Sequence, residues 1–130
     1  MTFRPETVSI DTWPAIFALL QPALEAGGDT TAHELIDDLL ADRAQLWVLR
    51  GEGGDPKAAG VTERFGPVLH CHLLGGDDMG AWLDDLFAAV AAHAVPAGVE
   101  RLTLEGRPGW ERVLGARGWR KRAIVMERAL

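Results

Sequence analysis

The sequence has no tyrosine, one cysteine and no apolar run of the length that spans a membrane. The absence of tyrosine excludes catalysis by a phenol group, and the single Cys71 excludes both a disulfide framework and a cysteine-based metal site. The first residues, Met1 to Glu6, lack the basic-then-apolar layout of a secretion signal. We therefore expect a cytoplasmic protein of a bacterium or a phage-infected cell, without a membrane partner. Association with a virion stays open.

Length and composition indicate one globular domain spanning residues 1–130. The chain is 48% hydrophobic and 25% charged, which is typical of a domain with a packed core. Lysine is scarce, with 2 residues against 11 arginines. That bias is typical of a GC-rich bacterial or phage genome.

The formal net charge of −6 is distributed unevenly. Residues 1–100 carry 5 basic and 16 acidic groups, a net charge of −11, whereas residues 101–130 carry 8 basic and 3 acidic groups, a net charge of +5. The two parts are expected to complement each other within one subunit or across a homodimer. The alternative is an anion-binding patch formed by Arg117, Arg120, Lys121 and Arg122. Because the chain is acidic overall, we expect no nucleic-acid partner.

The first half of the chain predicts a short strand and two helices. Pro5 restricts any strand in residues 2–9 to a short or edge position. Asp11 or Thr12 can cap a helix that ends at Gly27-Gly28, with Pro22 bending or dividing it. The pattern Thr31-x-x-Glu34 is a capping box for a second helix, whose predicted buried stripe is Leu35, Leu39 and Leu40.

The second half alternates strand and helix patterns. Residues 45–50 and 58–65 predict a hairpin, followed by a strand over 68–74 and an amphipathic helix from Met79. A strand over 100–105, a short helix over 110–116 and a final strand over 119–128 complete the prediction. Three meander strands followed by a helical crossover indicate a mixed sheet with a parallel pair formed by 68–74 and 100–105. The predicted class is α+β, with a mixed, mostly antiparallel sheet of about six strands flanked by about four helices.

The junction between residues 68–74 and the following helix is the first candidate site. A strand, a glycine turn and a helix N-terminus direct backbone N–H groups at one spot, which suits an anion. Asp77 and Asp78 occupy that turn. They are interpreted as helix caps that accept the free N–H groups, with a cofactor site as the alternative.

His70, Cys71 and His72 are the second candidate group. Two histidines at i and i+2 share one face of a strand and could supply a general base near neutral pH. Their alternative role is ordinary packing under a helix. A metal site is not expected, because no third ligand is evident.

Glu105 ends its predicted strand and is the other candidate, as a base or as the group that holds a substrate amine. Its alternative role is a salt bridge to Arg107 or Arg112. In Gly106-Arg-Pro-Gly-Trp110, Pro108 and the two glycines are expected to fix a loop in which Arg107 could hold an anion. The alternative is a helix entry with Trp110 packed on the core.

The order of elements resembles that of the GNAT (GCN5-related N-acetyltransferase) superfamily from Val8 to Leu130. Gly118-Trp119 resembles the glycine–aromatic pair that follows the family's last helix, and residues 125–130 resemble its closing strand. Leu46-Trp47, the Gly-Gly-Asp-Asp turn and residues 106–110 also resemble small phage- and prophage-encoded proteins related to GNAT enzymes.

The resemblance implies acetyl-CoA lying between the strands at 68–74 and 100–105. Backbone at His72 and Leu74 would hold the pantetheine, and the turn containing Gly75, Gly76, Asp78 and Gly80 would hold the pyrophosphate. The family's loop, Gln/Arg-x-x-Gly-x-Gly/Ala, falls here on Gly75, Asp78 and Gly80, and only the last position matches. One like-charge contact at such a site costs roughly 1–3 kcal/mol, about tenfold or more in affinity.

The family's usual acid, a tyrosine four residues before the glycine–aromatic pair, is replaced by Leu114. The sequence therefore favours a GNAT-fold protein with a degenerate acetyl-CoA site that acts as a binding or structural module for an unknown protein partner. The alternative is an acetyl-CoA-dependent N-acetyltransferase in which His72 or Glu105 deprotonates an unknown small-molecule amine. The gap between the strands at 68–74 and 100–105 distinguishes the two. An open, polar gap favours acetyl-CoA, and a gap filled by side chains argues against it.

Overall fold

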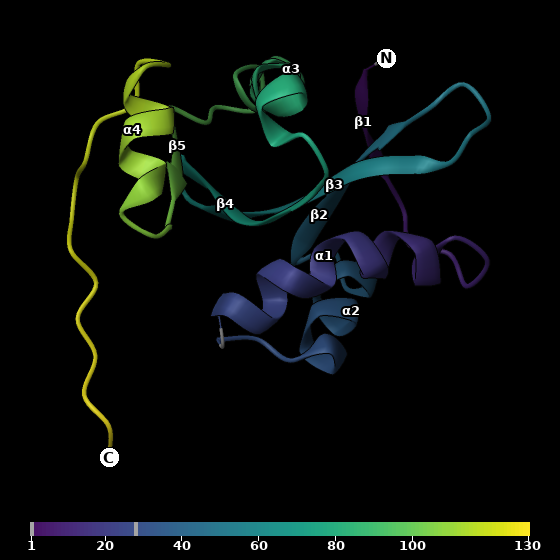
Figure 1. Ribbon diagram of the computed structural model, residues 1–130, viewed down its shortest axis with the longest axis horizontal. Helices are drawn as coiled ribbons and strands as arrows, with labels where there is room; N and C mark the ends of the chain where they lie inside the picture. The colour runs from purple at the N-terminus through teal and green to yellow at the C-terminus, as the bar shows by residue number, and fades with distance from the viewer. Residues whose placement is uncertain (1, 28) are drawn as a thin grey trace.

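The structure, a computed structural model, describes residues 2–27 and 29–130 (Figure 1). Four helices and five strands are present in these residues. In chain order they are β1 (Phe3–Glu6), α1 (Trp13–Gly27), α2 (Ala32–Leu40), β2 (Ala44–Arg50), β3 (Pro56–Phe65), β4 (Val68–Gly76), α3 (Met79–Ala94), β5 (Arg101–Leu104) and α4 (Gly109–Gly115). No helix of the described part is long and apolar enough to cross a membrane.

The strands form one mixed sheet in the order β1-β2-β3-β4-β5. β1 to β4 pair antiparallel, and β4 pairs with β5 in parallel, which confirms the predicted α+β class and the predicted parallel pair. β1 is a four-residue edge strand that contains Pro5, as expected. The sheet has five strands among the described residues, one fewer than predicted.

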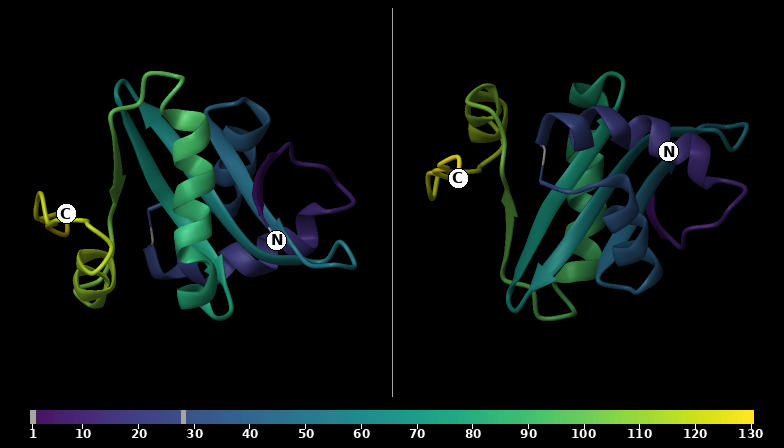
Figure 2. Two further views of the ribbon diagram at one scale, coloured as in Figure 1. Left: turned by 90° about the horizontal axis from the view of Figure 1, so that it is seen from above. Right: turned by 90° about the horizontal axis from the view of Figure 1, so that it is seen from below.

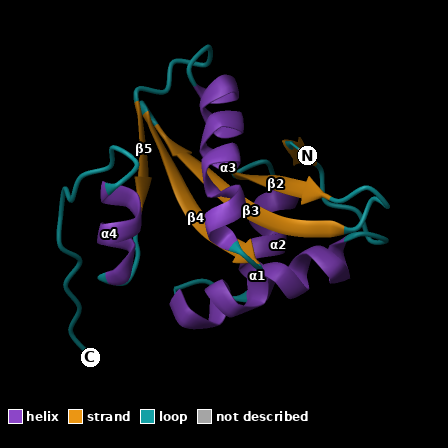
Figure 3. Cartoon of the chain, turned by 45° about the horizontal axis from the view of Figure 1, so that its top comes forward, coloured by secondary structure: helices purple, strands orange, loops and turns teal. Residues whose placement is uncertain are grey.

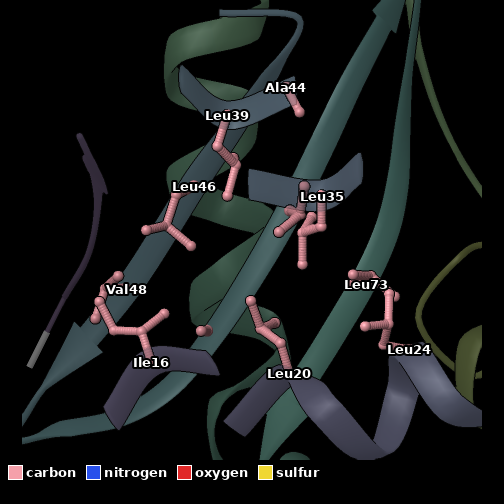
Figure 4. Close-up of a cluster of buried hydrophobic side chains, with 11 residues drawn as sticks. Ile16, Leu20, Leu24, Leu35, Leu39, Ala44, Leu46, Val48 and Leu73 are labelled. Atoms are coloured by element: carbon pink, nitrogen blue, oxygen red, sulfur yellow. The ribbon is translucent and has the colours of Figure 1, made fainter. Parts of the chain in front are cut away.

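Helices cover both faces of the sheet (Figure 2). The alternation of β2 explains the two layers, since Leu46 and Val48 pack on the α1 and α2 side while Trp47 and Leu49 pack on the α3 side. Figure 4 shows the first of these cores, in which Ile16, Leu20 and Leu24 of α1 point at the sheet. The second core contains Trp82, Leu83, Leu86 and Val90 of α3, together with Phe3 and Leu114.

The beginnings of α1 and α2 follow from local hydrogen bonds. Ser9 and Thr12 bond through their hydroxyl groups (2.7 Å) just before α1. The predicted capping of α2 by Thr31 is confirmed, because the Glu34 N–H donates to Thr31 Oγ1 (3.1 Å). The Glu34 carboxylate accepts the Thr31 hydroxyl (3.0 Å) in place of the Thr31 backbone N–H of a full capping box.

Two helix predictions need correction or qualification. α1 continues through Pro22 as one helix, so the proline does not divide it. Its last described residue is Gly27, and Gly28, also expected at the helix end, lies outside the described residues. In α2, Leu35 and Leu39 are buried as predicted, but Leu40 is 63% exposed. The helix is only nine residues long, and its narrow buried face ends at Leu39.

The predicted final strand over residues 119–128 is wrong. The chain after α4 has no helix or strand, and it extends away from the sheet (Figures 1 and 3). The apolar run Ala123 to Met126 has strand propensity, but a strand exists only when a neighbour accepts its backbone hydrogen bonds. Here β5 bonds only to β4.

Gly75 lets the backbone of α1 approach β4. A Cβ atom added at Gly75 would collide with the Leu19 carbonyl group of α1, and Leu20 N would lie 3.3 Å from it. Because the obstacle is backbone, a side chain can be accommodated only if α1 moves. This contact fixes the position of α1 at the end of β4 that leads into the glycine turn.

We expect Gly75→Ala to lower the free energy of unfolding by about 1–3 kcal/mol, the usual cost of overpacking. Gly80→Ala is the matched control, since its added Cβ meets nothing within 4 Å and it lies in the first turn of α3. Chemical denaturation of both variants measures the difference. Equal stability of the two variants would contradict the close approach of α1 to β4.

Candidate functional site

β4 and β5 separate in the middle of β4. Only Val68 to Cys71 pair with β5, whose last paired residue is Leu104, whereas β4 continues to Gly76. On the other side of β4, Val61 pairs with Leu73 and Thr62 with Cys71, which leaves His72 as the extra residue of a β-bulge. A bulge bends its strand and increases the local twist, and this bulge lies where β4 and β5 part.

A cavity of about 460 Å³ lies at this opening. β4 contributes residues 70–74 to its wall, the end of α1 and the following loop contribute a second side, and residues 104–107 with Trp110 contribute the third. Its polar side chains are those of Asp29, Thr30, His70, His72, Glu105 and Arg107. The gap between the strands is therefore open and is lined in part by polar side chains, which is the arrangement expected for acetyl-CoA.

The structure brings His72 and Glu105, the two predicted catalytic residues, to the same cavity. His72 Nε2 lies 3.2 Å from Thr30 Oγ1 and 3.9 Å from Glu63 Oε1. Its side chain is 20% exposed, so it is accessible from the cavity. If His72 accepts a proton, the Glu63 carboxylate is close enough to stabilise the imidazolium ion.

His70 lies beside His72, with 6.3 Å between the ring centroids. Its Nδ1 atom is 2.9 Å from Thr103 Oγ1 of β5, so this contact joins the two strands near the point where they part. Partial burial lowers the pKa of His70, and the nearby His72 adds to that effect while Glu105 and Glu63 oppose it. His70 is therefore a neutral imidazole near neutral pH.

Cys71 takes no part in this polar group. It pairs with Thr62, whose hydroxyl accepts a hydrogen bond from Trp47 Nε1 (3.0 Å). The Cys71 side chain is buried, and burial raises the pKa of its thiol to about 12. A neutral, buried thiol is a poor nucleophile.

Glu105 and Arg107 extend the cavity beyond the end of β5. The alternative predicted for Glu105, a salt bridge to Arg107 or Arg112, is absent from the ion pairs of the described residues. Trp110 partly packs on the α3-side core and also covers Gly106, where an added Cβ would lie 2.5 Å from Trp110 Cδ1. Gly106 and Trp110 thus fix the loop that presents Glu105 and Arg107.

The glycine turn places Asp78 directly before α3, in the left-handed conformation (φ +56°). The prediction that an aspartate side chain caps α3 is wrong for Asp78, which makes no such hydrogen bond. Instead, the Asp78 carbonyl accepts the Ala81 N–H (2.9 Å), and the Asp77 carbonyl accepts Trp82 Nε1 (2.9 Å). The left-handed backbone turns the Asp78 side chain away from the position a capping residue normally takes.

The N–H groups of residues 77–80 therefore have no acceptor among the described residues. Both aspartates of the turn are exposed. Free N–H groups at a helix N-terminus suit a pyrophosphate, and the carboxylates of Asp77 and Asp78 oppose it.

The residues accordingly fit acetyl-CoA at its reactive end better than at its pyrophosphate. β4 runs beyond β5 from His72 to Gly76, so backbone on that side is available to a pantetheine group. The predicted cofactor residues His72 and Leu74 line the cavity. The other four are outside its lining, since Gly75 and Gly76 end β4, Asp78 lies in the turn and Gly80 lies in the first turn of α3. Among the described residues, no set of three or more acidic, histidine or cysteine side chains is arranged to hold a metal ion.

Glu63 and Thr30 are the site residues that sequence reasoning missed. Glu63 could have been found from the hairpin register, because the Gly66-Pro67 turn pairs Phe65 with Val68 and hence Glu63 with His70. Thr30 comes from the loop between α1 and α2, and no local pattern predicts its proximity to β4.

Comparison with known proteins shows the fold. No family model matches the sequence, and no curated protein matches it. Three similar solved structures are an acetyltransferase from Trypanosoma brucei, AAC(6')-Iy in complex with the bisubstrate analogue CoA-S-monomethyl-acetylneamine, and a predicted acetyltransferase from Clostridium acetobutylicum with acetyl-CoA.

These likenesses extend over nearly the whole of each chain. The T. brucei protein is 16% identical with a TM-score of 0.71, over 98% of this chain and 99% of that one. AAC(6')-Iy is 13% identical with a TM-score of 0.73, over 100% and 99%. The C. acetobutylicum protein is 8% identical with a TM-score of 0.69, over 98% and 96%. The chain thus has the GNAT-like fold of acetyltransferases.

The lowered pKa of His70 predicts a pH dependence of stability. Below about pH 6.5 the unfolded chain binds a proton at His70 more readily than the folded chain does, so stability falls as the pH drops through that value. We expect His70→Gln to reduce this acid sensitivity and the exposed His33→Gln to leave it unchanged. Denaturant titrations between about pH 5 and 8 measure the slope. An unaltered slope in His70→Gln would contradict the assignment.

Proposed function

We propose that the protein is an acetyl-CoA-dependent N-acetyltransferase that acts on a cationic small-molecule amine. The observation that carries this proposal is the opening between β4 and β5, where a polar cavity contains His72 within reach of Glu63. The fold shared with acetyltransferases supports the same reaction class. When bound, acetyl-CoA supplies a thioester whose acetyl group is transferred to nitrogen while its thiol is released.

His72 is the base in this proposal. An amine must lose a proton to become a nucleophile, and His72 Nε2 can accept that proton directly or through one water. The Thr30 hydroxyl, 3.2 Å away, orients the ring, and Glu63, 3.9 Å away, stabilises the imidazolium ion. Burial lowers the pKa of His70, whose ring lies next to that of His72, so His70 does not compete with His72 for the proton.

Glu105 is the group that attracts and positions the substrate. Its carboxylate has no ion-pair partner among the described residues, and it lines the cavity together with the exposed Asp29. Arg107 is the only cationic side chain among the described residues of the cavity wall. Two exposed carboxylates in a concave site favour a positively charged acceptor.

A second candidate function is a binding module without catalysis, encoded by a phage or prophage. Two observations favour it. Asp77 and Asp78 place negative charge at the turn expected to hold a pyrophosphate. Leu114, at the position of the family's usual acid, is buried in the α3-side core. A protein of this kind would bind neither CoA nor acetyl-CoA.

Calorimetric titration with acetyl-CoA distinguishes the two functions. We expect Asp77→Asn and Asp78→Asn each to tighten binding, by about tenfold, because each removes one like-charge contact with the pyrophosphate. Asparagine tolerates the left-handed backbone of Asp78, so the turn is preserved. Asp85→Asn, an exposed carboxylate further along α3, is the control and should leave the affinity unchanged. Absence of binding at about millimolar acetyl-CoA in every variant would exclude the acetyltransferase.

The roles of His72 and Glu105 are separable by steady-state kinetics with a panel of amines, monitored by release of the free thiol. His72→Gln should lower kcat by about 10²–10⁴-fold, the usual contribution of a general base. Glu105→Gln should raise KM for the cationic amine by about tenfold with a smaller effect on kcat. His33→Gln, on the exposed face of α2, should behave as wild type. Wild-type turnover by both cavity variants would overturn the proposed mechanism.

A further inference from the structure

The candidate base and the candidate binding carboxylate lie on two different strands, on either side of the gap. His70 of β4 pairs with Thr103 of β5, and their side chains are 2.9 Å apart. Alternation along a strand places His72 on the same face as His70, and Glu105 on the same face as Thr103. The two strands diverge beyond this pair (Figure 3), and both His72 and Glu105 line the cavity that opens there.

The carboxylate of Glu105 is available to bind a cation. Glu105 is exposed, and it takes part in none of the ion pairs among the described residues. Asp29, on the wall formed by the loop after α1, is exposed as well, and Arg107 is the cation next to Glu105 in the chain. Two carboxylates against one guanidinium give this wall an excess of negative charge, which attracts cations.

Glu105 is unsuited to hold the nitrogen that reacts. A carboxylate beside an ammonium group stabilises its charged form and raises its pKa, so an amine paired with Glu105 keeps its proton and has no lone pair for attack. The reacting nitrogen must instead lie at His72 Nε2, which can accept its proton. A molecule with a single nitrogen can occupy only one of these positions at a time, whereas a molecule with two cationic nitrogens can occupy both.

We propose that the acceptor is a linear diamine, in which one nitrogen reacts at His72 while the other stays protonated and pairs with Glu105. This inference rests on the proposed acetyltransferase reaction. His72 takes one proton from the reacting ammonium group, and the nitrogen then bonds to the acetyl carbon. The bond from that carbon to sulfur breaks, and a second proton of the nitrogen reaches the sulfur to give the free thiol. The ammonium group at Glu105 is unchanged throughout.

The same arrangement predicts that only one end of the diamine is acetylated. The amide formed at His72 carries no charge, so it cannot replace the ammonium group at Glu105 when the product binds in the reverse direction. The remaining amine is therefore not presented to His72. Mass spectrometry of the products should show the monoacetyl compound alone. A diacetyl product formed as fast as the monoacetyl one would contradict the pairing at Glu105.

Binding without turnover tests the pairing apart from the reaction. Calorimetric titration of the full-length protein, with and without CoA, compares each diamine from diaminopropane to diaminohexane with the amino alcohol of the same length. The amino alcohol replaces the second ammonium group with a neutral hydroxyl. At least one diamine should bind about tenfold more tightly than its amino alcohol, because it adds one charge-assisted hydrogen bond.

Variants at the two ends of β5 identify the carboxylate responsible. Glu105→Gln should remove the preference for the diamine, whereas Glu100→Gln, an exposed carboxylate just before β5 and outside the cavity lining, should retain it. Equal or undetectable binding of both members of every pair by the wild type would overturn the proposal. A preference for diamines that survives in Glu105→Gln would overturn it as well.

Steady-state kinetics with acetyl-CoA separates a failure of this inference from a failure of the proposed function. The wild type should have a kcat/KM about tenfold higher for the preferred diamine than for its amino alcohol, and Glu105→Gln should make the two values equal. Turnover of both compounds at the same kcat/KM by the wild type would overturn the diamine and leave the acetyltransferase standing. Absence of acetyl-CoA binding, with a diamine preference that depends on Glu105, would support the pairing and overturn the reaction.

Discussion

The β-bulge at His72 is the constraint on which the site depends. A single extra residue in β4 changes which side chains face the α1–α2 side, and it coincides with the loss of pairing to β5. His70 and His72 therefore reach the same cavity as Thr30, with Glu63 3.9 Å from His72, while Cys71 remains buried beside Thr62. Packing on both sides of the sheet holds this geometry, since Leu73 belongs to the α1-side core and Leu74 packs against the α3-side core.

Most of the fold could be predicted because its signals are local. The capping box, the Gly66-Pro67 turn and the 3.6-residue spacing of Trp82, Leu83, Leu86 and Val90 each specify an element without reference to distant residues. The final strand failed for the opposite reason, because its existence requires a partner edge that no property of residues 119–128 can supply. The predicted burial of Leu40 was wrong because periodicity indicates which face of a helix is apolar but not how far the rest of the protein covers that face.

The site residues could be predicted only where they lie in a predicted strand or directly after one. His72 and Glu105 follow from their positions in or directly after predicted strands, and the structure brings both to one cavity. Thr30 lies in a loop between helices, whose position no single-sequence pattern determines. Glu63 was within reach of the hairpin register, because the Gly66-Pro67 turn pairs Glu63 with His70. The role expected of Asp78 was reasonable from composition, but the left-handed backbone at that residue redirects its side chain. The backbone conformation of Asp78 thus determines that its side chain leaves the N–H groups at the start of α3 uncapped.

The short ladder between β4 and β5 also has a consequence for motion. Four residue pairs join β5 to the sheet, whereas eight join β3 to β4. The remaining attachment of the C-terminal portion is the packing of residues such as Leu102, Leu114 and Trp119 against α3. Segments with few backbone hydrogen bonds to the main sheet open at lower free energy than the rest of a domain. One wall of the cavity therefore belongs to a unit that can shift while the antiparallel strands β1 to β4 stay folded. The width of the cleft can then adapt to the molecule that enters it.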